Sequence, residues 1–591
     1  MGPRLPRRHG RAMHSEVMIV GAGPVGLALA NLLGRYGRDV TLLESRSRLI
    51  DYPRGVGLDD ESMRSIQTMG LVEQVEPYTI PHHVMRLVNG RGETMVTNAP
   101  QGEPFGWPRK FGFIQPLVDQ QLHEGLERFG NVRVLFDHTV TRSVDRGEHV
   151  EVTATVTEAD GSTREQVFTA DYLVGCEGGS SPTRKRMDVD FVGESPSTRW
   201  VVIDVNNDPL GAPNVYLGAD PARPYVSIGL PHGIRRWEFM LFDDEPSERV
   251  EDDAFVAGLL ADHVPDSSAL DVIRRRVFTH HGRIASSFRQ GRILIAGDAA
   301  HLMPVWMGQG WNSGMRDATN LAWKLASVLA GQADESLLDT YDVERRDHAK
   351  AMIDLSMTFG SVIKPTNRAV CAVRDTVSRA MNLSPRVKSY FADMRFKPMP
   401  FYAKGVIVSP DSLLPGEQER RRTSRFMSVR NAVDKQTPVG KQFIQPRVNT
   451  HEHTGVRLDD VIGPWWTVAA WGNDPARLFT QEERHQLEHM GARFVSFMSE
   501  SQRPWAEREY AGSGTLVVGD TDGSLKGWFD RSAMGVVFLR PDRFVAAACL
   551  AQESGRALSA LRVAMGATSV GSLRGSAAHG FAPQGPVGVS A

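Results

Sequence analysis

Cysteine is scarce in this chain, and neither sign of charge dominates. Only 3 cysteines (Cys176, Cys371 and Cys549) occur among the 591 residues, and none belongs to a Cys-x-x-Cys pair. We therefore expect no disulfide framework and no cysteine-based metal site, and this usage is typical of a reducing cytoplasm. The 18 histidines show no metal-ligand spacing, so no metal is expected. The net charge of −2 gives no reason to expect a nucleic acid or an anionic membrane as partner.

The chain also lacks an uninterrupted hydrophobic run of membrane length. The stretch from Val17 to Leu33 is uncharged and follows a basic N-terminus, but glycine, proline and asparagine interrupt it. No small-residue cleavage pattern is present, so we expect neither a membrane span nor a signal peptide. With 41% hydrophobic and 23% charged residues, the composition is that of a globular protein, and the length suggests several domains.

Glycine is plentiful, and its first informative group is Gly21-x-Gly23-x-x-Gly26. An apolar run at 16–20 predicts a strand before it, and an amphipathic pattern at 24–36 predicts a helix after it. Gly21 permits the tight turn, Gly23 lets a pyrophosphate approach the backbone, and Gly26 lets the helix pack closely on the strand. The free N–H groups at the start of the helix would then face the phosphates.

Glu44 completes this first motif. It ends a second predicted strand, at 39–43, where a carboxylate can bind the ribose of an adenosine. The same carboxylate would repel a 2′-phosphate, so the site suits FAD or NAD and not NADP.

A second cofactor pattern lies far downstream. Residues 292–296 predict a strand that ends at Gly297-Asp298, where a carboxylate can bind ribityl hydroxyls. The loop Gly308-Gln309-Gly310 then leads into a helix, and such a helix start suits the pyrimidine edge of a flavin, where negative charge develops on reduction. Asp298 alone would more often be a turn or helix-capping residue. Both motifs in one chain predict FAD held at two places by one domain.

These motifs resemble those of the single-component flavoprotein aromatic hydroxylases, typified by p-hydroxybenzoate and phenol hydroxylases. A third motif of that family is DYLVGCEGGSS at 171–181, although the family normally has Asp where Glu177 stands. Arg54 and Gln115 also fall where the family places cofactor-contacting residues. The resemblance implies cofactor contacts from Val20, Gly21, Gly23, Pro24, Val25, Gly26, Glu44, Arg54, Gln115, Glu177, Gly297, Asp298, Ala299, Pro304, Gly308, Gln309, Gly310 and Asn312.

Longer segments resemble the bacterial 3-(3-hydroxyphenyl)propionate/3-hydroxycinnamate hydroxylases. They include IDYPRGVGLDDESMRSIQTMGL, FGWPRKFGFIQPLVDQQL, DPARPYVSIGLPHGIRRWEFM and GDAAHLMPVWMGQGWNSGMRDATNLAWKL. The resemblance implies an FAD- and NADH-dependent monooxygenase. It would use O2 to convert 3-(3-hydroxyphenyl)propionate to 3-(2,3-dihydroxyphenyl)propionate, and 3-hydroxycinnamate to 2,3-dihydroxycinnamate. Three alternatives stay open: a hydroxylase of another phenolic or polycyclic aromatic, an FAD oxidoreductase without oxygen insertion, and a non-enzymatic flavin-binding sensor or scaffold.

The predicted fold class is α/β. Period-2 patterns such as WVVIDVNN and WEFMLF predict a mainly antiparallel sheet, interleaved in sequence with a Rossmann-like FAD-binding domain. The predicted divisions are a leader at 1–14, the FAD-binding domain at 15–80, 111–189 and 286–397, the substrate domain at 81–110 and 190–285, a linker at 398–435, a C-terminal domain at 436–566 and a disordered tail at 567–591.

Residues 436–566 predict a separate α/β unit. Strands are expected at 466–470, 493–497, 516–518 and 536–539, and helices at 481–489 and 557–565. The resemblance to phenol hydroxylases implies a thioredoxin-like domain. Because no Cys-x-x-Cys is present, we expect it to be structural and to lie at the subunit interface of a homodimer.

The catalytic residues are less well defined. A phenol has a pKa near 10, so its ionisation at pH 7 costs about 4 kcal/mol unless the protein supplies a proton acceptor. The active-site Asp of phenol hydroxylases falls at Val56, so that role is not carried over. Candidates from this chain are Tyr225, Asp59 and His232, and also Asp60 and His83. Asp59 belongs to the charged segment Asp59-Asp60-Glu61, for which a helix N-terminus stabilised by the helix dipole is the favoured interpretation, and Tyr225 could equally belong to the core.

Arginine is the expected partner of a substrate carboxylate, because its guanidinium binds a carboxylate in a bidentate fashion. Arg223 is the leading candidate, followed by Arg235 and Arg236. The last two are adjacent in a strand, so at most one should face the pocket. Aromatic residues that could line a flat pocket are Trp306, Trp311 and Phe111.

Overall fold

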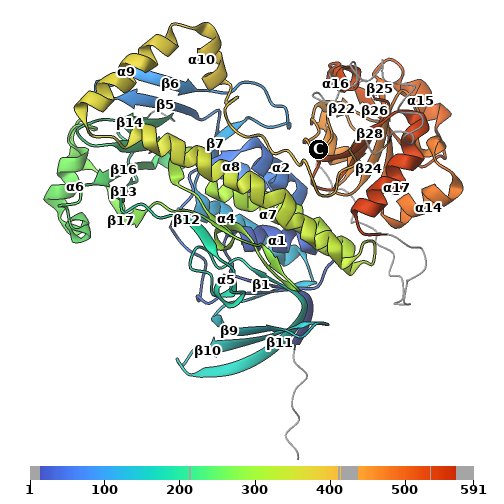
Figure 1. Ribbon diagram of the computed structural model, residues 1–591, viewed down its shortest axis with the longest axis horizontal. Coiled ribbons are helices and arrows are strands. Elements are labelled where there is room, and N and C mark those ends of the chain that lie inside the picture. The colour runs from blue at the N-terminus through green and yellow to red at the C-terminus, as the bar shows by residue number, and fades with distance from the viewer. Residues whose placement is uncertain are drawn as a thin grey trace, which may run out of the picture.

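The computed structural model describes residues 13–52, 54–211, 214–409, 413, 437–532 and 534–567. The predicted tail, apart from Ala567, and most of the predicted linker lie outside these residues. Of the leader predicted at 1–14, only Met13 and His14 are described, and both belong to the first strand. Figure 1 shows two large sheets on either side of a pair of long central helices, with a C-terminal unit set to one side.

The first sheet has eight strands, and its main path runs β19-β20-β11-β1-β2-β8. Its five central strands, from β20 to β8, are parallel, and β9 and β10 extend β11 in antiparallel fashion. The strands are β1 (Met13–Val20), β2 (Val40–Leu43), β8 (Val132–Leu135), β9 (His138–Asp145), β10 (Val150–Thr157), β11 (Thr163–Gly175), β19 (Arg289–Gln290) and β20 (Ile293–Ile295). Val17, Met18 and Ile19 of β1 are completely buried, as expected for a parallel strand covered on both faces.

The predicted strand–turn–helix at the N-terminus is confirmed. Helix α1 (Pro24–Arg35) follows β1 directly, and β2 ends one residue before Glu44. The strand begins earlier than predicted, because β1 also pairs with β11 as far back as Met13. Helix α1 packs on α7 (Gly310–Leu329), which is the helix that follows the second glycine-rich loop.

The second sheet has seven strands in the order β17-β13-β16-β15-β14-β5-β6. Its strands are β5 (Val84–Asn89), β6 (Thr94–Asn98), β13 (Arg199–Val205), β14 (Asn214–Ala219), β15 (Tyr225–Gly229), β16 (Arg235–Leu241) and β17 (Val272–Thr279). Both segments predicted for the substrate domain therefore contribute to one sheet. Every pairing in it except that of β14 with β5 is antiparallel, which makes the sheet mixed but mainly antiparallel, as the period-2 patterns indicate.

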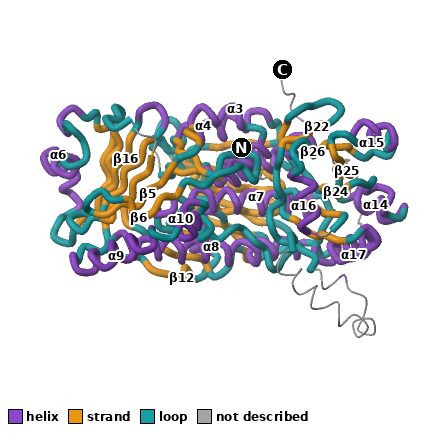
Figure 2. The backbone as a smooth tube through the Cα atoms, turned by 90° about the horizontal axis from the view of Figure 1, so that it is seen from above, coloured by secondary structure: helices purple, strands orange, loops and turns teal. Residues whose placement is uncertain are grey.

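Short elements join these two sheets. One small sheet contains β3 (Gly57–Asp59), β7 (Lys110–Phe113) and β4 (Thr79–Pro81), and another contains β12 (Phe191–Glu194), β18 (Gly282–Ala285) and β21 (His301–Leu302). The helices are α2 (Asp60–Met69), α3 (Val72–Val75), α4 (Gln115–Glu124), α5 (Pro182–Arg186), α6 (Asp253–Leu260), α8 (Asp339–Ile363), α9 (Arg368–Asn382) and α10 (Pro385–Ala392). Figure 2 shows α7 and α8 lying between the second sheet and the C-terminal unit.

The C-terminal unit is a separate α/β body, as predicted. Its sheet runs β23-β22-β26-β25-β24-β27-β28, with β24, β25 and β26 parallel and β27 and β28 antiparallel to their neighbours. The elements are β22 (Arg447–Asn449), β23 (Val456–Arg457), α13 (Leu458–Ile462), β24 (Thr467–Trp471), α14 (Gln481–His489), β25 (Arg493–Ser499), α15 (Arg503–Glu509), β26 (Leu516–Asp520), α16 (Ser524–Ser532), β27 (Val536–Leu539), β28 (Val545–Cys549) and α17 (Ser554–Ala564). The four strands and two helices that the sequence predicts here are confirmed within a few residues.

Candidate active site

One cavity of about 600 Å³ joins the first sheet to the second. Its floor is formed by the segments that follow β1, β2, β11 and β20, at the carboxyl ends of the parallel strands, where open α/β sheets bind ligands. Its opposite wall is one face of the second sheet, and the loop before α7 closes a side. The volume suits a ligand of cofactor or substrate size.

Two glycines of the first motif have different roles: Gly26 allows close packing, and Gly23 leaves open space. A Cβ built on Gly26 would lie 2.1 Å from the carbonyl oxygen of Gly21, so the close packing of helix on strand requires glycine there. A Cβ built on Gly23 would meet nothing within 4 Å, and Gly23 lines the cavity. The open space beside the start of α1 fits a pyrophosphate group.

Glu44 lies in the cavity wall and is held by its own loop. One carboxylate oxygen accepts a hydrogen bond from the Ala22 amide at 2.8 Å, and the other accepts from the Arg46 amide at 2.9 Å. These contacts hold the carboxylate beside the β1–α1 turn. Carboxylate oxygens can accept further hydrogen bonds, so Glu44 fits a ribose diol.

Asp298 follows β20 and faces the same cavity from the other side. Its carboxylate accepts no hydrogen bond from any residue that the structure describes, and burial raises its pKa. A half-buried acceptor without a protein donor fits a polyol such as a ribityl chain. The turn before it is fixed from behind, because the Gly297 amide and the His301 ring both donate to Asp317, at 2.9 and 2.7 Å.

Most of the other predicted cofactor residues also line the cavity. Those that do are Val20, Gly21, Pro24, Val25, Arg54, Gln115, Glu177, Gly308, Gln309 and Gly310. The five that do not are Gly26, Gly297, Ala299, Pro304 and Asn312, which lie behind the wall. Asn312 illustrates their role, because its amide donates to the carbonyl oxygens of Gly57 and Gly308 and so ties two loops of the wall together.

Two of the lining residues hold the loops around them. The Gln115 side chain accepts hydrogen bonds from the backbone amides of Arg54 and Gly55. Glu177 accepts from Ser181 at 2.6 Å and from the Thr183 amide at 3.1 Å, so both of its oxygens are directed to its own loop. The extra methylene of Glu relative to the Asp of the family is accommodated there.

The predicted aromatic set, Trp306, Trp311 and Phe111, lines the cavity. Trp306 is only 3% exposed, and its ring packs edge-on against Trp200 at 4.9 Å. Trp311 packs against Phe113 at 5.1 Å. The two tryptophans are thus packed against other aromatic rings at the cavity wall, an arrangement that suits a flat aromatic ligand.

The four residues proposed for catalysis lie elsewhere. Asp59 caps α2 through the Ser62 amide and is ion-paired to Arg316 and Lys397. These two cations and the helix cap outweigh the effect of burial and hold the pKa of Asp59 well below its usual range. Asp59 is therefore part of a buried structural network that α7 completes.

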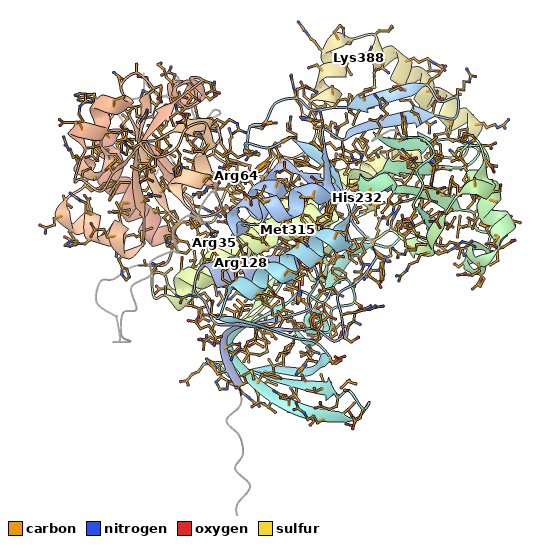
Figure 3. All side chains as sticks on the ribbon, turned by 180° about the vertical axis from the view of Figure 1, so that it is seen from behind. Arg35, Arg64, Arg128, His232, Met315 and Lys388 are labelled. Atoms are coloured by element: carbon orange, nitrogen blue, oxygen red, sulfur yellow. The ribbon has the colours of Figure 1, made fainter. Side chains whose placement is uncertain are left out.

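Tyr225, Arg223 and His232 do not line this cavity either. Tyr225 alternates with Val226, and it is Val226 that faces the cavity, while Tyr225 packs on His263 at 4.3 Å on the opposite face. Arg223 forms a bidentate pair with Glu245, at 2.8 and 2.7 Å. Figure 3 shows His232 at the edge of the second sheet, where its backbone is left-handed (φ 58°) and its side chain is exposed.

The two further arginine candidates are also already paired with acids. Arg235 pairs with Asp208 and Arg236 with Asp204, and both guanidiniums are buried. They point to opposite faces of β16, as alternation predicts, and Arg236 is on the same face as the cavity.

Among the polar residues of the cavity wall, Glu238 and Lys110 are not candidates from the sequence, whereas His83 is one of them. Burial raises the pKa of Glu238 to about 7 and lowers that of His83 to about 4. The only sequence signal for Glu238 is that it is the one acidic residue of the strand RRWEFML, in which it follows two arginines. Among the described residues, no group of histidines, cysteines and acids could hold a metal ion, and no helix is long and apolar enough to span a membrane.

Comparison with known proteins agrees with this geometry. A family model described as FAD binding domain matches residues 14–356, and one described as HcaD C-terminal domain matches residues 440–564. A 3-(3-hydroxy-phenyl)propionate/3-hydroxycinnamic acid hydroxylase of Mycobacterium avium (strain 104) is 48% identical over 545 residues, which cover 91% of this chain and 90% of that protein. The protein of the same name from Escherichia coli O8 (strain IAI1) is 44% identical over 550 residues, covering 93% and 94%.

Solved structures share the fold at lower identity. The flavin-dependent monooxygenase PieE, in complex with FAD and substrate, has a TM-score of 0.76 at 19% identity and covers 94% of this chain and 100% of its own. Aklavinone-11 hydroxylase, in a ternary complex with FAD and aklavinone, has a TM-score of 0.70 at 22% identity, covering 93% and 99%. With the family model matching more than half of its length and relatives 48% identical, the chain belongs to the FAD-binding monooxygenase family, among the 3-(3-hydroxy-phenyl)propionate/3-hydroxycinnamic acid hydroxylases.

Proposed function

We propose that this chain is an FAD- and NADH-dependent monooxygenase that acts on 3-(3-hydroxyphenyl)propionate and 3-hydroxycinnamate. It adds a hydroxyl group ortho to the existing one, and the products are the 2,3-dihydroxy compounds of aromatic degradation. The observation that carries the proposal is the 48% identity to hydroxylases of these substrates over 91% of the chain. The cavity is consistent with it, since one part fits FAD and the other is an apolar, aromatic-lined space.

FAD, when bound, supplies the chemistry that reduces O2 with electrons from NADH and transfers one oxygen atom to the ring. We assign its binding to the open turn at Gly23, to Glu44 for the ribose and to Asp298 for the ribityl chain. The start of α7 would lie at the pyrimidine edge, where its N–H groups stabilise negative charge.

The protein's own part in the reaction is to hold the ring and to exclude water. Trp306 and Trp311 bound the ring space from the loop before α7 and the first turn of that helix. The facing wall carries Met85, Leu217 and Ile228, which leave few groups that could retain water. A dry site favours transfer of oxygen to the ring over its loss as H2O2.

The C-terminal unit is proposed to be thioredoxin-like and structural. The order β25-β24-β27-β28, with one parallel and two antiparallel pairings, supports this assignment. Without a Cys-x-x-Cys it has no redox role, and we propose that it contributes to a homodimer interface. We also propose a cytoplasmic location, because the three cysteines are buried free thiols.

The experiment is NADH oxidation by the purified protein with and without 3-(3-hydroxyphenyl)propionate, with the product identified by mass and ring substitution. Substrate-stimulated NADH use with near-stoichiometric 2,3-dihydroxy product would establish the proposal. Stimulated NADH use that yields only H2O2 would favour an oxidoreductase without oxygen insertion on this ring. No stimulation would overturn the substrate assignment, and other phenols would then be tested.

A further inference from the structure

Glu238 is the one carboxylate on the wall that the second sheet presents to the cavity. The other sheet residues on this wall are apolar: Met85, Val215, Leu217, Val226 and Ile228. Glu238 is only 4% exposed, and its Oε2 has no hydrogen-bond partner among the described residues. A buried carboxylate without a donor is costly, so its position in this wall calls for a ligand that supplies one.

The neighbours of Glu238 do not satisfy it. Arg236 lies two residues away on the same face, but its guanidinium is bidentate to Asp204, at 2.7 and 3.0 Å. Burial raises the pKa of Glu238 to about 7, Arg236 partly opposes this, and Asp204 adds to it. The carboxyl group can therefore gain and lose a proton near neutral pH.

A cation lies on another side of the same cavity. Lys110 begins β7, lines the cavity, and forms no ion pair with any carboxylate that the structure describes. Burial and the charge of Lys397 lower the pKa of Lys110 to about 8, so Lys110 is still mainly protonated at pH 7. Among the arginines considered for a carboxylate, Arg223, Arg235 and Arg236 are each already paired with an acid.

His83 contacts both the strand that carries Lys110 and the strand that pairs with Glu238. A Cβ on Gly112, which shares a face of β7 with Lys110, would lie 2.9 Å from the His83 ring, and His83 bonds to the carbonyl oxygen of Gly229 at 2.9 Å. Along β15, Gly229 is three residues from Val226, which pairs with Glu238. At about 3.4 Å per residue, the residue that His83 contacts on β15 lies about 10 Å along the strand from the one beside Glu238. Lys110, His83 and Glu238 all line the same cavity, which places a cation and a carboxylate at separate points of its wall.

We propose that Glu238 accepts the hydrogen bond of the substrate's ring hydroxyl and takes its proton, while Lys110 binds the substrate's carboxylate. This inference rests on the proposed function and names the two groups that orient its substrate. In the step, the phenolic O–H bond breaks, its electron pair stays on the phenolic oxygen, and the proton moves to a carboxylate oxygen of Glu238. The ring becomes more electron-rich, which favours attack on an electrophilic oxygen at the adjacent carbon.

Binding of three ligands to the FAD-loaded protein tests the assignment. They are 3-(3-hydroxyphenyl)propionate, 3-phenylpropionate, which lacks the hydroxyl, and 3-ethylphenol, which lacks the carboxylate. Lys110→Met should weaken the binding of the two ligands that carry a carboxylate roughly 10- to 100-fold, and should leave the affinity for 3-ethylphenol within about threefold of the wild type. The matched control is Lys350→Met, at an exposed lysine on α8 that is paired with Asp354. Equal weakening of all three ligands, or of none, would overturn the role of Lys110.

Turnover tests Glu238. Glu238→Gln keeps the shape of the side chain and should lower kcat/KM for 3-(3-hydroxyphenyl)propionate roughly 100- to 10,000-fold. A ring-fluorinated analogue, whose phenol ionises more readily, should recover much of that loss, which a purely structural role would not produce. The control is Glu93→Gln, at a surface glutamate of the β5–β6 turn, and Glu238→Met is the second variant if Glu238→Gln does not retain FAD. Turnover within about threefold of the wild type would overturn the role of Glu238.

The two proposals can fail separately. If the wild type hydroxylates the substrate but the variants behave as their controls do, this inference is wrong and the proposed function stands. If the wild type forms no hydroxylated product but its ligand binding depends on Lys110 as described, the binding assignment stands and the proposed reaction is wrong.

Discussion

A buried charge network joins the C-terminal unit to α7 and α8, and replacing Arg540 by Met should disrupt it. Arg540 follows β27 and donates to both oxygens of Glu344 on α8, at 2.7 and 2.8 Å, and to Asp542 at 2.9 Å. Lys324 on α7 donates to Glu344 at 2.7 Å. All four side chains are 0–1% exposed, and their formal charges cancel.

The magnitude follows from this balance. Without Arg540, two fully buried carboxylates share one lysine. Removing one partner of a buried pair typically costs about 3–5 kcal/mol. Arg133→Met is the control, because the Arg133–Asp39 pair is 43% and 42% exposed and should contribute no more than about 1 kcal/mol. Figure 3 shows that Arg64, which pairs with Asp459 across the same boundary, also lies beside the C-terminal unit.

Urea unfolding followed by tryptophan fluorescence measures the effect, since Trp323 and Trp466 pack 5.5 Å apart at this boundary. The two cations overcome the effect of burial and lower the pKa of Glu344 to about 2. Its stabilising contribution is therefore present above the ordinary Glu pKa and is lost as the pH falls through the folded value. In Arg540→Met the deficit should shrink below that ordinary pKa, because protonation there removes an uncompensated charge. A deficit below about 1 kcal/mol, equal to that of Arg133→Met, would refute the reasoning.

Three further predictions concern the cavity. Gly23→Val should leave the thermal stability of the FAD-free protein near that of the wild type but raise the FAD Kd at least tenfold, because the space beside Gly23 is open. Gly26→Ala should instead destabilise the FAD-free protein, because its Cβ would lie 2.1 Å from a carbonyl oxygen. Melting curves and FAD titrations distinguish the two variants. Equal FAD affinity in Gly23→Val and the wild type would contradict the assignment of the Gly23 turn to FAD binding. The kcat/KM for 3-(3-hydroxyphenyl)propionate should rise with pH through about 7, as Glu238 loses its proton, and this limb should vanish in Glu238→Gln. Arg223→Met should leave the KM for 3-(3-hydroxyphenyl)propionate within about twofold of the wild-type value, because Arg223 is bound to Glu245 outside the cavity. A tenfold rise in KM would show instead that Arg223 binds the substrate's carboxylate.

The parts of the site that the sequence predicts are those built by neighbouring residues. Gly23 and Glu44 belong to one strand–turn–helix–strand unit, and Asp298 lies in the turn that follows its strand, so the local pattern fixes their relation to a ligand. The interleaving of two domains and the separate C-terminal unit also follow from the periods of the apolar residues.

The remaining candidates depended on partners that are remote in sequence. Asp59 is drawn into ion pairs by Arg316 and Lys397, more than 250 residues away, and no local pattern around Asp59 indicates either partner. The alternation in β15 and β16 separates Tyr225 from Val226, but both faces of the second sheet are largely buried. Hydrophobicity therefore cannot say which face borders the cavity.

The sequence by itself thus determined the cofactor and the family, because these rest on short-range backbone geometry and on similarity along the chain. Only the tertiary structure decided that Glu238 and Lys110, and not Tyr225 and Arg223, line the cavity. The physical reason is that a charged side chain is available to a ligand only where folding leaves it without a protein partner, and pairing with a remote residue is settled by packing.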